Sequence, residues 1–334
     1  MEEVRSLIPD FGKHSALDSK AIHSFAINAS SKLKKDGTPD RRGEHDAAIS
    51  QKTRFVEKAD GTTEEVAYQY FGFKVHLMVD IPTQLPIACR ITQGLVADGP
   101  MALPILKSLD SKHPELVKGC ETLAADRAYD DEKSIAKAHD TYGVEMLVPT
   151  RNLWRKGDFI IKDADGKETL LKQLPGNGKE ELAYDQDGQL YCFHKDASSG
   201  AEDHYPMTFK GYEKDRESLK YVCPAKAKGF TCGRCAECPF ANGQVRVKTE
   251  TDRRIFVPLP RHTLSFQRAY NGRTAVERAN GVLDTVFGFE WHSMRGLATV
   301  SLRVNLALAC MLAMAIGRIK NGQAGLLRSL VRAA

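Results

Sequence analysis

The sequence lacks any apolar run long enough to cross a bilayer. Its most apolar stretch, LALACMLAMAIG at 306–317, falls short of the roughly 20 residues that a membrane-spanning helix needs, so it predicts a buried helix. The first residues, MEEVRSLIPDFG, are acidic and hold no long apolar segment, which argues against a signal peptide. We therefore expect a cytoplasmic protein that makes no membrane contact and keeps its thiols reduced.

The sequence also lacks the two marks of a disordered chain, low hydrophobicity and a strong excess of one charge. Of its 334 residues, 42% are hydrophobic and 27% are charged, and the net charge is +5, as in a globular protein with a core. Acids are absent from 291–334, where six basic residues lie, and 246–278 carries eight Lys and Arg against three acids. The C-terminal third therefore suits a polyanion such as nucleic acid, although a solvated basic face has the same pattern.

Hydrophobic periodicity divides the chain into parts. Over residues 1–150 strand and helix patterns alternate, interrupted by a polar, turn-rich stretch at 28–66 that we expect to be an exposed insertion, either a loop or a loose hairpin. Residues 151–262 carry short strands and Gly/Asp turns, which predict an inserted β-rich lobe. Residues 263–320 are helical and complete the first part, and 321–334 form a tail.

The first part predicts an α/β fold, a mixed sheet flanked by helices, with the β-rich lobe inserted before the last acidic helix. The expected strands lie at 14–27, 68–80, 85–94, 120–126 and 144–150, and the expected helices at 99–110 and 130–143. A single helical pattern begins at 264.

Three acids stand out by their position in these elements. Asp18, in LDSKAI, lies among apolar residues of the first strand, Asp126 ends the strand CETLAAD, and Glu277 lies on a helix. Tyr270, Arg273 and Glu277 are spaced three and four residues apart, which places them on one helical face. Each acid alone has an ordinary reading, since a strand-end Asp is commonly a turn or cap and a helical Glu an ion-pair partner.

Three segments resemble the acidic motifs of the DDE transposases of bacterial insertion sequences, namely LDSKAI, LAADRAYDDEK and AYNGRTAVERANGVL. The last contains Tyr-x2-Arg-x3-Glu, which resembles the signature of the hairpin-forming branch of that family. YFGFKVHLMVD, LPIACRITQGLVADGPMALPIL and GFEWHSMRGLATV resemble further parts of that branch, so the resemblance spans about 10–317. It implies a ribonuclease-H-like sheet, with the first Asp on the central strand, the second ending its neighbour, and the Glu on a helix beside them.

The resemblance implies an enzyme that moves DNA. Asp18, Asp126 and Glu277 would be the catalytic residues and would bind two Mg²⁺ or Mn²⁺ ions about 3.5–4 Å apart. The reaction would be phosphodiester hydrolysis at the inverted-repeat ends of a transposon, then strand transfer to target DNA. Relatives act as dimers on paired ends, so we expect a homodimer on DNA, associated with the bacterial nucleoid. Asp80, a rival for the first acid, closes the strand HLMVD and suits a hairpin turn.

The resemblance and the basic residues near the motifs also predict DNA contacts. The expected DNA-binding residues are Tyr270, Arg273, Arg278, Lys74 and His76. A plain ion pair to Glu277 is the alternative for Arg273, and an ordinary solvent-facing position the alternative for Lys74 and His76. Members of the branch carry a Lys seven residues after the Glu to hold a phosphate, whereas this sequence has Asp284 there.

The N-terminal part departs from the family pattern. Only 17 residues precede Asp18, whereas relatives carry a helical region there that binds the DNA ends. The alternative function is therefore a truncated, catalytically silent remnant or a DNA-binding module. A general nuclease of the same fold is a third hypothesis.

The cysteines gather in the predicted lobe. Cys232, Cys235 and Cys238 form CGRCAEC, Cys223 stands nine residues earlier, and Cys192 is a substitute ligand. Two-residue gaps let a tight turn aim several thiolates at one Zn²⁺, so Cys223, Cys232, Cys235 and Cys238 predict a structural zinc site. An iron–sulfur cluster and plain reduced cysteines are the open alternatives.

Overall fold

The computed structural model describes most of the chain. The described residues are 1–26, 33–38, 44–57, 63–162, 166, 168–176, 179, 181–195, 202–229, 238–241 and 243–328. The chain divides into two compact units. The first comprises 1–129, 141–144 and 272–334, and the second comprises 130–140 and 145–271.

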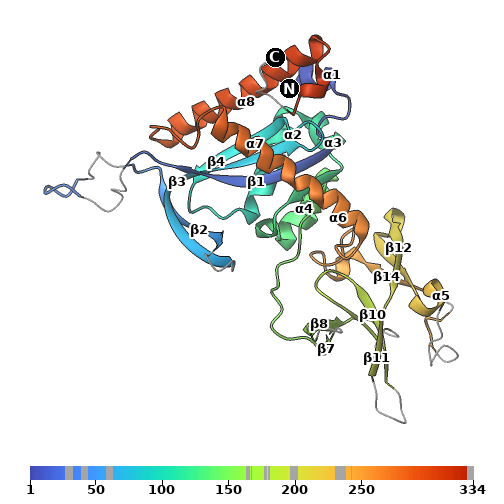
Figure 1. Cartoon of the computed structure of the whole chain (residues 1–334). Helices are drawn as coiled ribbons and strands as arrows, with labels where there is room; N and C mark the ends of the chain where they lie inside the picture. Colours follow the sequence, from blue (N-terminus) through green and yellow to red (C-terminus); the bar gives the residue numbers. More distant parts are fainter. Residues whose placement is uncertain are drawn as a thin grey trace. The chain divides into compact units, whose positions relative to one another are not determined.

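A mixed sheet forms the centre of the first unit (Figure 1). Its strands include β1 (His14–His23), β2 (Ala48–Glu57), β3 (Thr63–Asp80), β4 (Pro86–Gln93) and β5 (Thr122–Ala125). β1 lies between β3, which runs antiparallel to it, and β5, which runs parallel to it, while β2 and β4 both pair with β3. β1 is thus an interior strand, and its residues Ala16, Leu17 and Ile22 are buried.

Strand β3 changes partners along its 18 residues. Its first half pairs with β2, and its second half pairs with β1 on one edge and β4 on the other. Gly72 lies at the change, where a Cβ would meet the carbonyl oxygen of Ile22 at 2.1 Å, so a side chain cannot be accommodated there. The described part of the expected insertion at 28–66 therefore contributes to the sheet through β2 and the start of β3. The hairpin alternative for this stretch is confirmed where β2 pairs with the start of β3, but the sequence did not predict the bounds of β2, because its residues, AISQKTRFVE, are mostly polar.

In the described part of the first unit, the α-helices are α1 (Glu2–Leu7), α2 (Ala102–Lys112), α3 (Pro114–Gly119), α7 (Thr274–Thr285) and α8 (Leu297–Lys320). α7 packs against β1 and β3, and α2 and α8 pack against β4. Apolar side chains of the sheet, α7 and α8 form one core cluster, in which Phe73, Val276 and Val304 are fully buried. Since Val276 is held in this core, the helix face that carries its neighbour Glu277 is fixed relative to the sheet.

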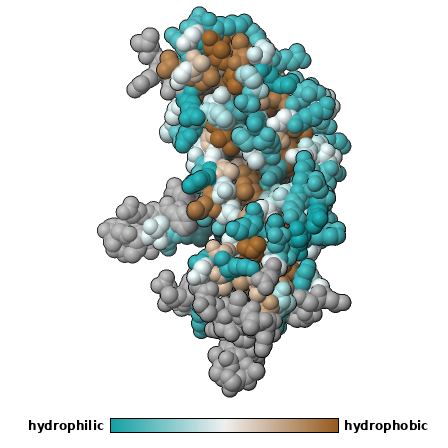
Figure 2. All heavy atoms as spheres, turned by 90° about the vertical axis from the view of Figure 1, so that its right-hand side faces the viewer, coloured by the Kyte–Doolittle hydropathy of each residue, from teal (hydrophilic) through white to brown (hydrophobic). Residues whose placement is uncertain are grey.

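The apolar run at 306–317 lies within the helix α8, as predicted, but the prediction that this helix is buried was wrong for part of it, since Leu306 and Met314 are exposed. Within the part of the chain that the structure describes, α8 is the one helix that could cross a membrane by length and composition, and 33% of its most apolar window is buried. Val300, Val304 and Met311 belong to the core cluster, whereas Leu302 and Leu306 are exposed. Figure 2 shows hydrophobic surface at the top of that view, the region where Figure 1 places α1 and the end of α8. α8 is therefore a core helix with an apolar outer side.

The second unit is rich in β-structure. One sheet has the strands β7 (Phe159–Lys162), β8 (Glu168–Gln173), β9 (Leu182–Tyr184), β10 (Leu190–Lys195) and β11 (Glu202–Pro206), and another has β12 (Thr208–Glu213), β13 (Ser218–Val222) and β14 (Gln244–Lys248). The other elements are α4 (Glu132–Tyr142), β6 (Glu145–Leu147), α5 (Pro224–Lys228) and α6 (Leu264–Tyr270). Buried aromatic side chains, among them Tyr184, Tyr221 and Phe256, meet in the core of this unit.

The helix expected from 264 onward is divided in two. α6 ends at Tyr270, a single 3-10 turn covers 271–273, and α7 begins after it. Gly272 in this turn lies against Ile81, whose side-chain carbons would be 2.9 Å from a Cβ. Tyr270 and Glu277 therefore lie on two successive helices that this turn joins. The prediction that Tyr270 shares one face with Arg273 and Glu277 stays a prediction.

Candidate active site

The strand register brings two of the predicted acids together. Leu17 of β1 pairs with Ala125, the last residue of β5, in a parallel ladder. Asp18 is the next residue on β1 and Asp126 directly follows β5, so the two acids start from neighbouring backbones roughly 5 Å apart. The Asp126 carboxylate accepts a hydrogen bond from the backbone N–H of Ala128 at 2.9 Å, which fixes its direction.

An open cavity of about 940 Å³ brings Glu277 to the same place as these two acids. Its walls come from β1, β2, the segment before α2, the end of β5 and the start of α7. The lining residues are Asp18, Ser19, Gln51, Thr53, Asp98, Asp126, Arg273 and Glu277. Four acids face one arginine in this lining, so the cavity carries net negative charge.

Crowded carboxylates shape the electrostatics of the cavity. Burial raises the pKa of the Asp126 carboxyl above its ordinary value, and Asp98 raises it further, whereas Arg273 lowers it. Burial also raises the pKa of Tyr129, to which the charges of Asp98, Asp18 and Asp126 add. The Tyr129 phenol therefore keeps its proton, and the carboxylates of the cavity repel one another unless a cation joins them.

A guanidinium lies between the first and the third acid. Arg273 Nη2 is 2.6 Å from Glu277 Oε1, and Arg273 Nη1 is 3.4 Å from Asp18 Oδ2. The Arg273 side chain is 21% exposed, against 19% for Asp18 and 50% for Glu277. The ion pair between Arg273 and Glu277, the alternative that the spacing offered, is confirmed. The contact with Asp18 was not predicted, because no local pattern joins residues this far apart in the chain.

Asp98 is the acid of this cavity that the sequence analysis missed. It lies in the segment between β4 and α2, where no strand or helix pattern marks it. Its Oδ1 accepts a hydrogen bond from Lys74 Nζ at 3.0 Å, and Lys74 Nζ also donates to the carbonyl oxygen of Val96 at 2.9 Å. His76 Nδ1 is 3.8 Å from the same Oδ1 of Asp98. A buried lysine is therefore the partner of the fourth acid.

Lys74 and His76 were expected to face DNA, and the structure contradicts the exposure on which that expectation depended. They are 7% and 0% exposed. Both lie on the half of β3 that pairs with β1 and β4, where the strand is interior to the sheet. The Nε2 atom of His76 is 3.1 Å from the hydroxyl of Thr92 on β4.

The family comparison agrees with this geometry. Residues 35–313, most of the chain, match the model of a transposase DDE domain. The chain belongs to the transposase DDE domain family. Asp126 and Glu277 lie inside the matched range of this transposase, and Asp18 lies before it. No curated protein and no solved structure matches the chain. Members of the family act on DNA and generally use divalent metal ions, and a transposase is expected in the cytoplasm.

The donor atoms of the transposase cavity suit Mg²⁺ or Mn²⁺, which prefer hard carboxylate oxygens. Within the described residues, no three acids, histidines or cysteines already form a group that could hold a metal ion. The guanidinium of Arg273 lies between Asp18 and Glu277 instead. The carboxylates of the cavity are therefore chemically suited to a divalent ion. For Asp18 and Glu277 to bind the same ion, the guanidinium of Arg273 must move away from them.

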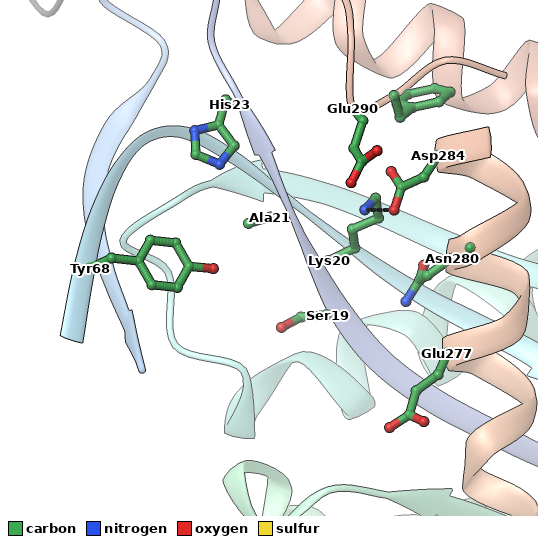
Figure 3. A pocket seen from close by; sticks show the side chains of 11 residues that line it. Ser19, Lys20, Ala21, His23, Tyr68, Glu277, Asn280, Asp284 and Glu290 are labelled. Carbon is green, nitrogen blue, oxygen red and sulfur yellow. Dashed lines mark hydrogen bonds and ion pairs between the residues drawn. The ribbon is translucent and has the colours of Figure 1, made fainter. Parts of the chain in front are cut away.

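A second hollow of about 550 Å³ shares Ser19 and Glu277 with the acidic cavity. Figure 3 shows Glu277 and Asp284 along α7 on one side of this hollow and Tyr68 on the other. Asp284 stands where the resemblance described above led us to expect a Lys, and its Oδ2 is 2.6 Å from Lys20 Nζ on β1. The cation of this hollow thus comes from the strand rather than from the helix.

Asp80, the rival for the first acid, is a structural residue. It is 1% exposed, and its Oδ1 accepts a hydrogen bond from the backbone N–H of Gly12 at 2.9 Å. Its Oδ2 accepts hydrogen bonds from the backbone N–H and the hydroxyl of Thr83. Asp80 therefore holds the turn between β3 and β4, and the interpretation as a hairpin-turn residue is confirmed.

Two further predicted DNA contacts lie outside the cavity lining. Arg278 is exposed on α7, directly after Glu277. Tyr270 lies in the second unit and stacks on Phe266, with 5.8 Å between the ring centroids. Their roles in DNA binding stay predictions.

The predicted zinc site falls partly outside the described residues. Cys232 and Cys235 lie outside them. Cys223 is buried at the start of α5, and Cys238 is half-buried. The zinc site therefore stays a prediction.

Proposed function

We propose that this transposase cleaves DNA at the inverted-repeat ends of a transposon and joins the freed 3′ end to target DNA, with Asp18, Asp126 and Glu277 as its catalytic carboxylates. The observation that carries the proposal is the acidic cavity, in which the register of β1 and β5 sets Asp18 beside Asp126 and α7 adds Glu277. The order of β4, β3, β1 and β5 supports a ribonuclease-H-like fold, into which the β-rich lobe would be inserted.

Each acid would hold Mg²⁺ or Mn²⁺ through a carboxylate oxygen. Two such ions, when bound, activate the attacking water or hydroxyl and stabilise the leaving oxygen. The Asp126 carboxylate accepts a hydrogen bond from the N–H of Ala128, and its pKa is raised because it is partly buried and lies near Asp98. A cation bound to it would lower that pKa again. Tyr129, fully buried among these acids, keeps its proton and adds no further negative charge.

DNA would be held by the cations that remain accessible. Arg273 and Arg278 at the start of α7 are the proposed phosphate ligands, and Tyr270 is a proposed backbone contact from the second unit. Lys74 and His76 are left out because they are buried. The acid-free stretch 291–334 supports further contact with the polyanion, and we propose that the transposase acts as a homodimer on paired ends.

The test is a cleavage and strand-transfer assay on the purified chain. A labelled duplex that carries the inverted repeats flanking the gene, a supercoiled target plasmid and MgCl₂ or MnCl₂ are incubated together. Wild type is expected to yield cleaved ends and joined product. Asp126→Asn is expected to lose roughly a hundredfold or more, since even changes outside the ligand shell lower activity 10–100-fold. Asp110→Asn, at an exposed aspartate of α2, is the matched control and should stay active.

The other outcomes of this assay contradict the assigned site or indicate a different function. Equal product from wild type and Asp126→Asn contradicts the assigned site. Cleavage of any duplex, independent of the repeats, indicates a general nuclease. Binding of the ends without cleavage indicates the catalytically silent DNA-binding alternative.

A further inference from the structure

We propose that Arg273 and a divalent cation compete for the carboxylates of Asp18 and Glu277, so that Arg273 is the internal counter-cation of the metal-free site. The inference rests on the proposed function, because it concerns how the acidic cavity receives its ion. It makes Arg273 a positioning residue, which holds the first and third acids ready for the metal.

The backbone delivers the Arg273 guanidinium to this position. Arg273 is the residue directly before α7, in the turn at 271–273. The neighbouring Gly272 packs closely against Ile81, and this contact holds the start of α7 against the first unit's residues after β3. From this anchored start the side chain reaches Glu277, one helical turn on, at 2.6 Å, and Asp18 on β1 at 3.4 Å. One terminal nitrogen faces each carboxylate, so a single planar group spans the gap between α7 and β1.

The charge of the cavity explains why a cation is needed between these acids. Four acids line the cavity, and the buried Lys74 is already engaged with Asp98. Without Arg273, Asp18 and Glu277 would lose the cation that they share, and their negative charges would repel each other and Asp126 more strongly. Arg273 neutralises them from within the chain.

A divalent ion on the same oxygens cannot leave this arrangement unchanged. It would place two positive groups within a few ångströms of each other, and their repulsion opposes joint occupancy. Coupling between two ligands of one site is reciprocal, so the metal weakens the hold on Arg273 by the same factor by which Arg273 weakens metal binding. The displaced guanidinium is then free to pair with a phosphate in a bidentate manner, which links metal loading to the phosphate contact proposed above.

The test measures binding of Mn²⁺ alone by the chain without DNA, through the electron paramagnetic resonance signal of free Mn²⁺. Arg273→Gln is expected to bind Mn²⁺ roughly five- to thirtyfold more tightly than wild type, because two partly exposed ion pairs no longer have to be broken. Arg273→Lys keeps a charge but loses the planar fork, so its Mn²⁺ affinity should fall between the two. Arg127→Gln removes the same charge from the exposed residue next to Asp126 and should change the affinity less than about twofold.

Thermal unfolding of the same proteins supplies the second readout. Without metal, Arg273→Gln should melt below wild type, and Mn²⁺ should raise its melting temperature by more than it raises that of wild type. If Arg273 has a merely structural role, Mn²⁺ should raise the melting temperature of Arg273→Gln by no more than it raises that of wild type. Equal or weaker Mn²⁺ binding by Arg273→Gln, with Arg273→Lys no tighter than wild type, overturns the proposal.

Asp126→Asn separates the failure of this inference from the failure of the proposed function. If wild type binds no more Mn²⁺ than Asp126→Asn does, the acidic cavity is not the metal site and the proposed function fails there. If Asp126→Asn loses Mn²⁺ binding while Arg273→Gln gains none, the site is correct and only the competition is wrong.

Discussion

The ion pair beside the acidic cavity gives the sharpest prediction of stability. Lys74 Nζ lies 3.0 Å from Asp98 Oδ1, and the two side chains are 9% and 17% exposed. Lys74→Met keeps an apolar stem of similar length but leaves Asp98 without its cation, in a cavity that it shares with Asp126. Breaking a buried ion pair from one side costs about 3–5 kcal/mol, so the free energy of unfolding is expected to fall by that amount.

The expected loss of stability has two parts, because Lys74 both donates a hydrogen bond and neutralises Asp98. Its Nζ also donates to the carbonyl oxygen of Val96 at 2.9 Å, and the loss of a hydrogen bond from a charged donor accounts for about 1.5–3 kcal/mol. The remainder is the uncompensated charge of Asp98, which Asp98→Asn removes. The double variant Lys74→Met/Asp98→Asn should therefore recover about half of the loss. In a thermal scan the single variant should melt on the order of 10 °C below wild type.

A surface pair of the same length is the matched control. Lys118 Nζ lies 3.1 Å from Glu115 Oε1, but these side chains are 71% and 57% exposed. Lys118→Met is therefore expected to cost less than about 1 kcal/mol. The reasoning from burial is refuted if Lys74→Met costs no more than Lys118→Met, or if the double variant is no more stable than Lys74→Met alone.

Two further predictions concern a buried acid and a close strand contact. Burial raises the pKa of Asp185 from 3.8 to about 6, so the folded chain holds this proton more tightly and stability should fall by roughly 3 kcal/mol as the pH rises from about 4 to about 6. Asp185→Asn should flatten this fall in the denaturation midpoint, and an unchanged slope would show that another group causes it. Gly72→Ala puts a Cβ 2.1 Å from the carbonyl oxygen of Ile22, so β1 and β3 must shift and about 1–3 kcal/mol should be lost in chemical denaturation. A loss below about 0.5 kcal/mol would mean that the strands separate there without strain.

Elements with a strong local pattern could be predicted from the sequence, and elements held by distant partners could not. β1, β4 and β5 lie within their predicted ranges, because their apolar residues form short runs, and those of β1 and β5 are mostly buried. A hairpin was one of two alternatives for 28–66, and the bounds of β2 were not predicted because its polar residues become a strand only by pairing with the first half of β3. The 3-10 turn between α6 and α7 was missed because it keeps right-handed helical dihedrals on both sides, so the helical pattern runs through it.

The candidate site divides in the same way. Motif order and the ends of the strands led to Asp18, Asp126 and Glu277, and the structure places all three in one cavity lining. Lys74 was misplaced because alternation along a strand separates two faces, and both faces of this half of β3 are covered. Asp98 could not be found because it lies outside any predicted strand or helix, and its ion pair is with Lys74 on β3, which is distant in the sequence.

The fold distinguishes its acids by what satisfies their oxygens. Asp80 accepts hydrogen bonds from backbone and hydroxyl donors on both oxygens, so it needs no cation. Asp98 is neutralised by Lys74, and the first and third acids share Arg273. Asp126 has a backbone N–H as a partner, and its pKa is raised by burial and by Asp98 despite the charge of Arg273. It is therefore the acid of the cavity that gains most from an added cation, and the Mn²⁺ affinity of Asp126→Asn is the measurement on which both proposals depend.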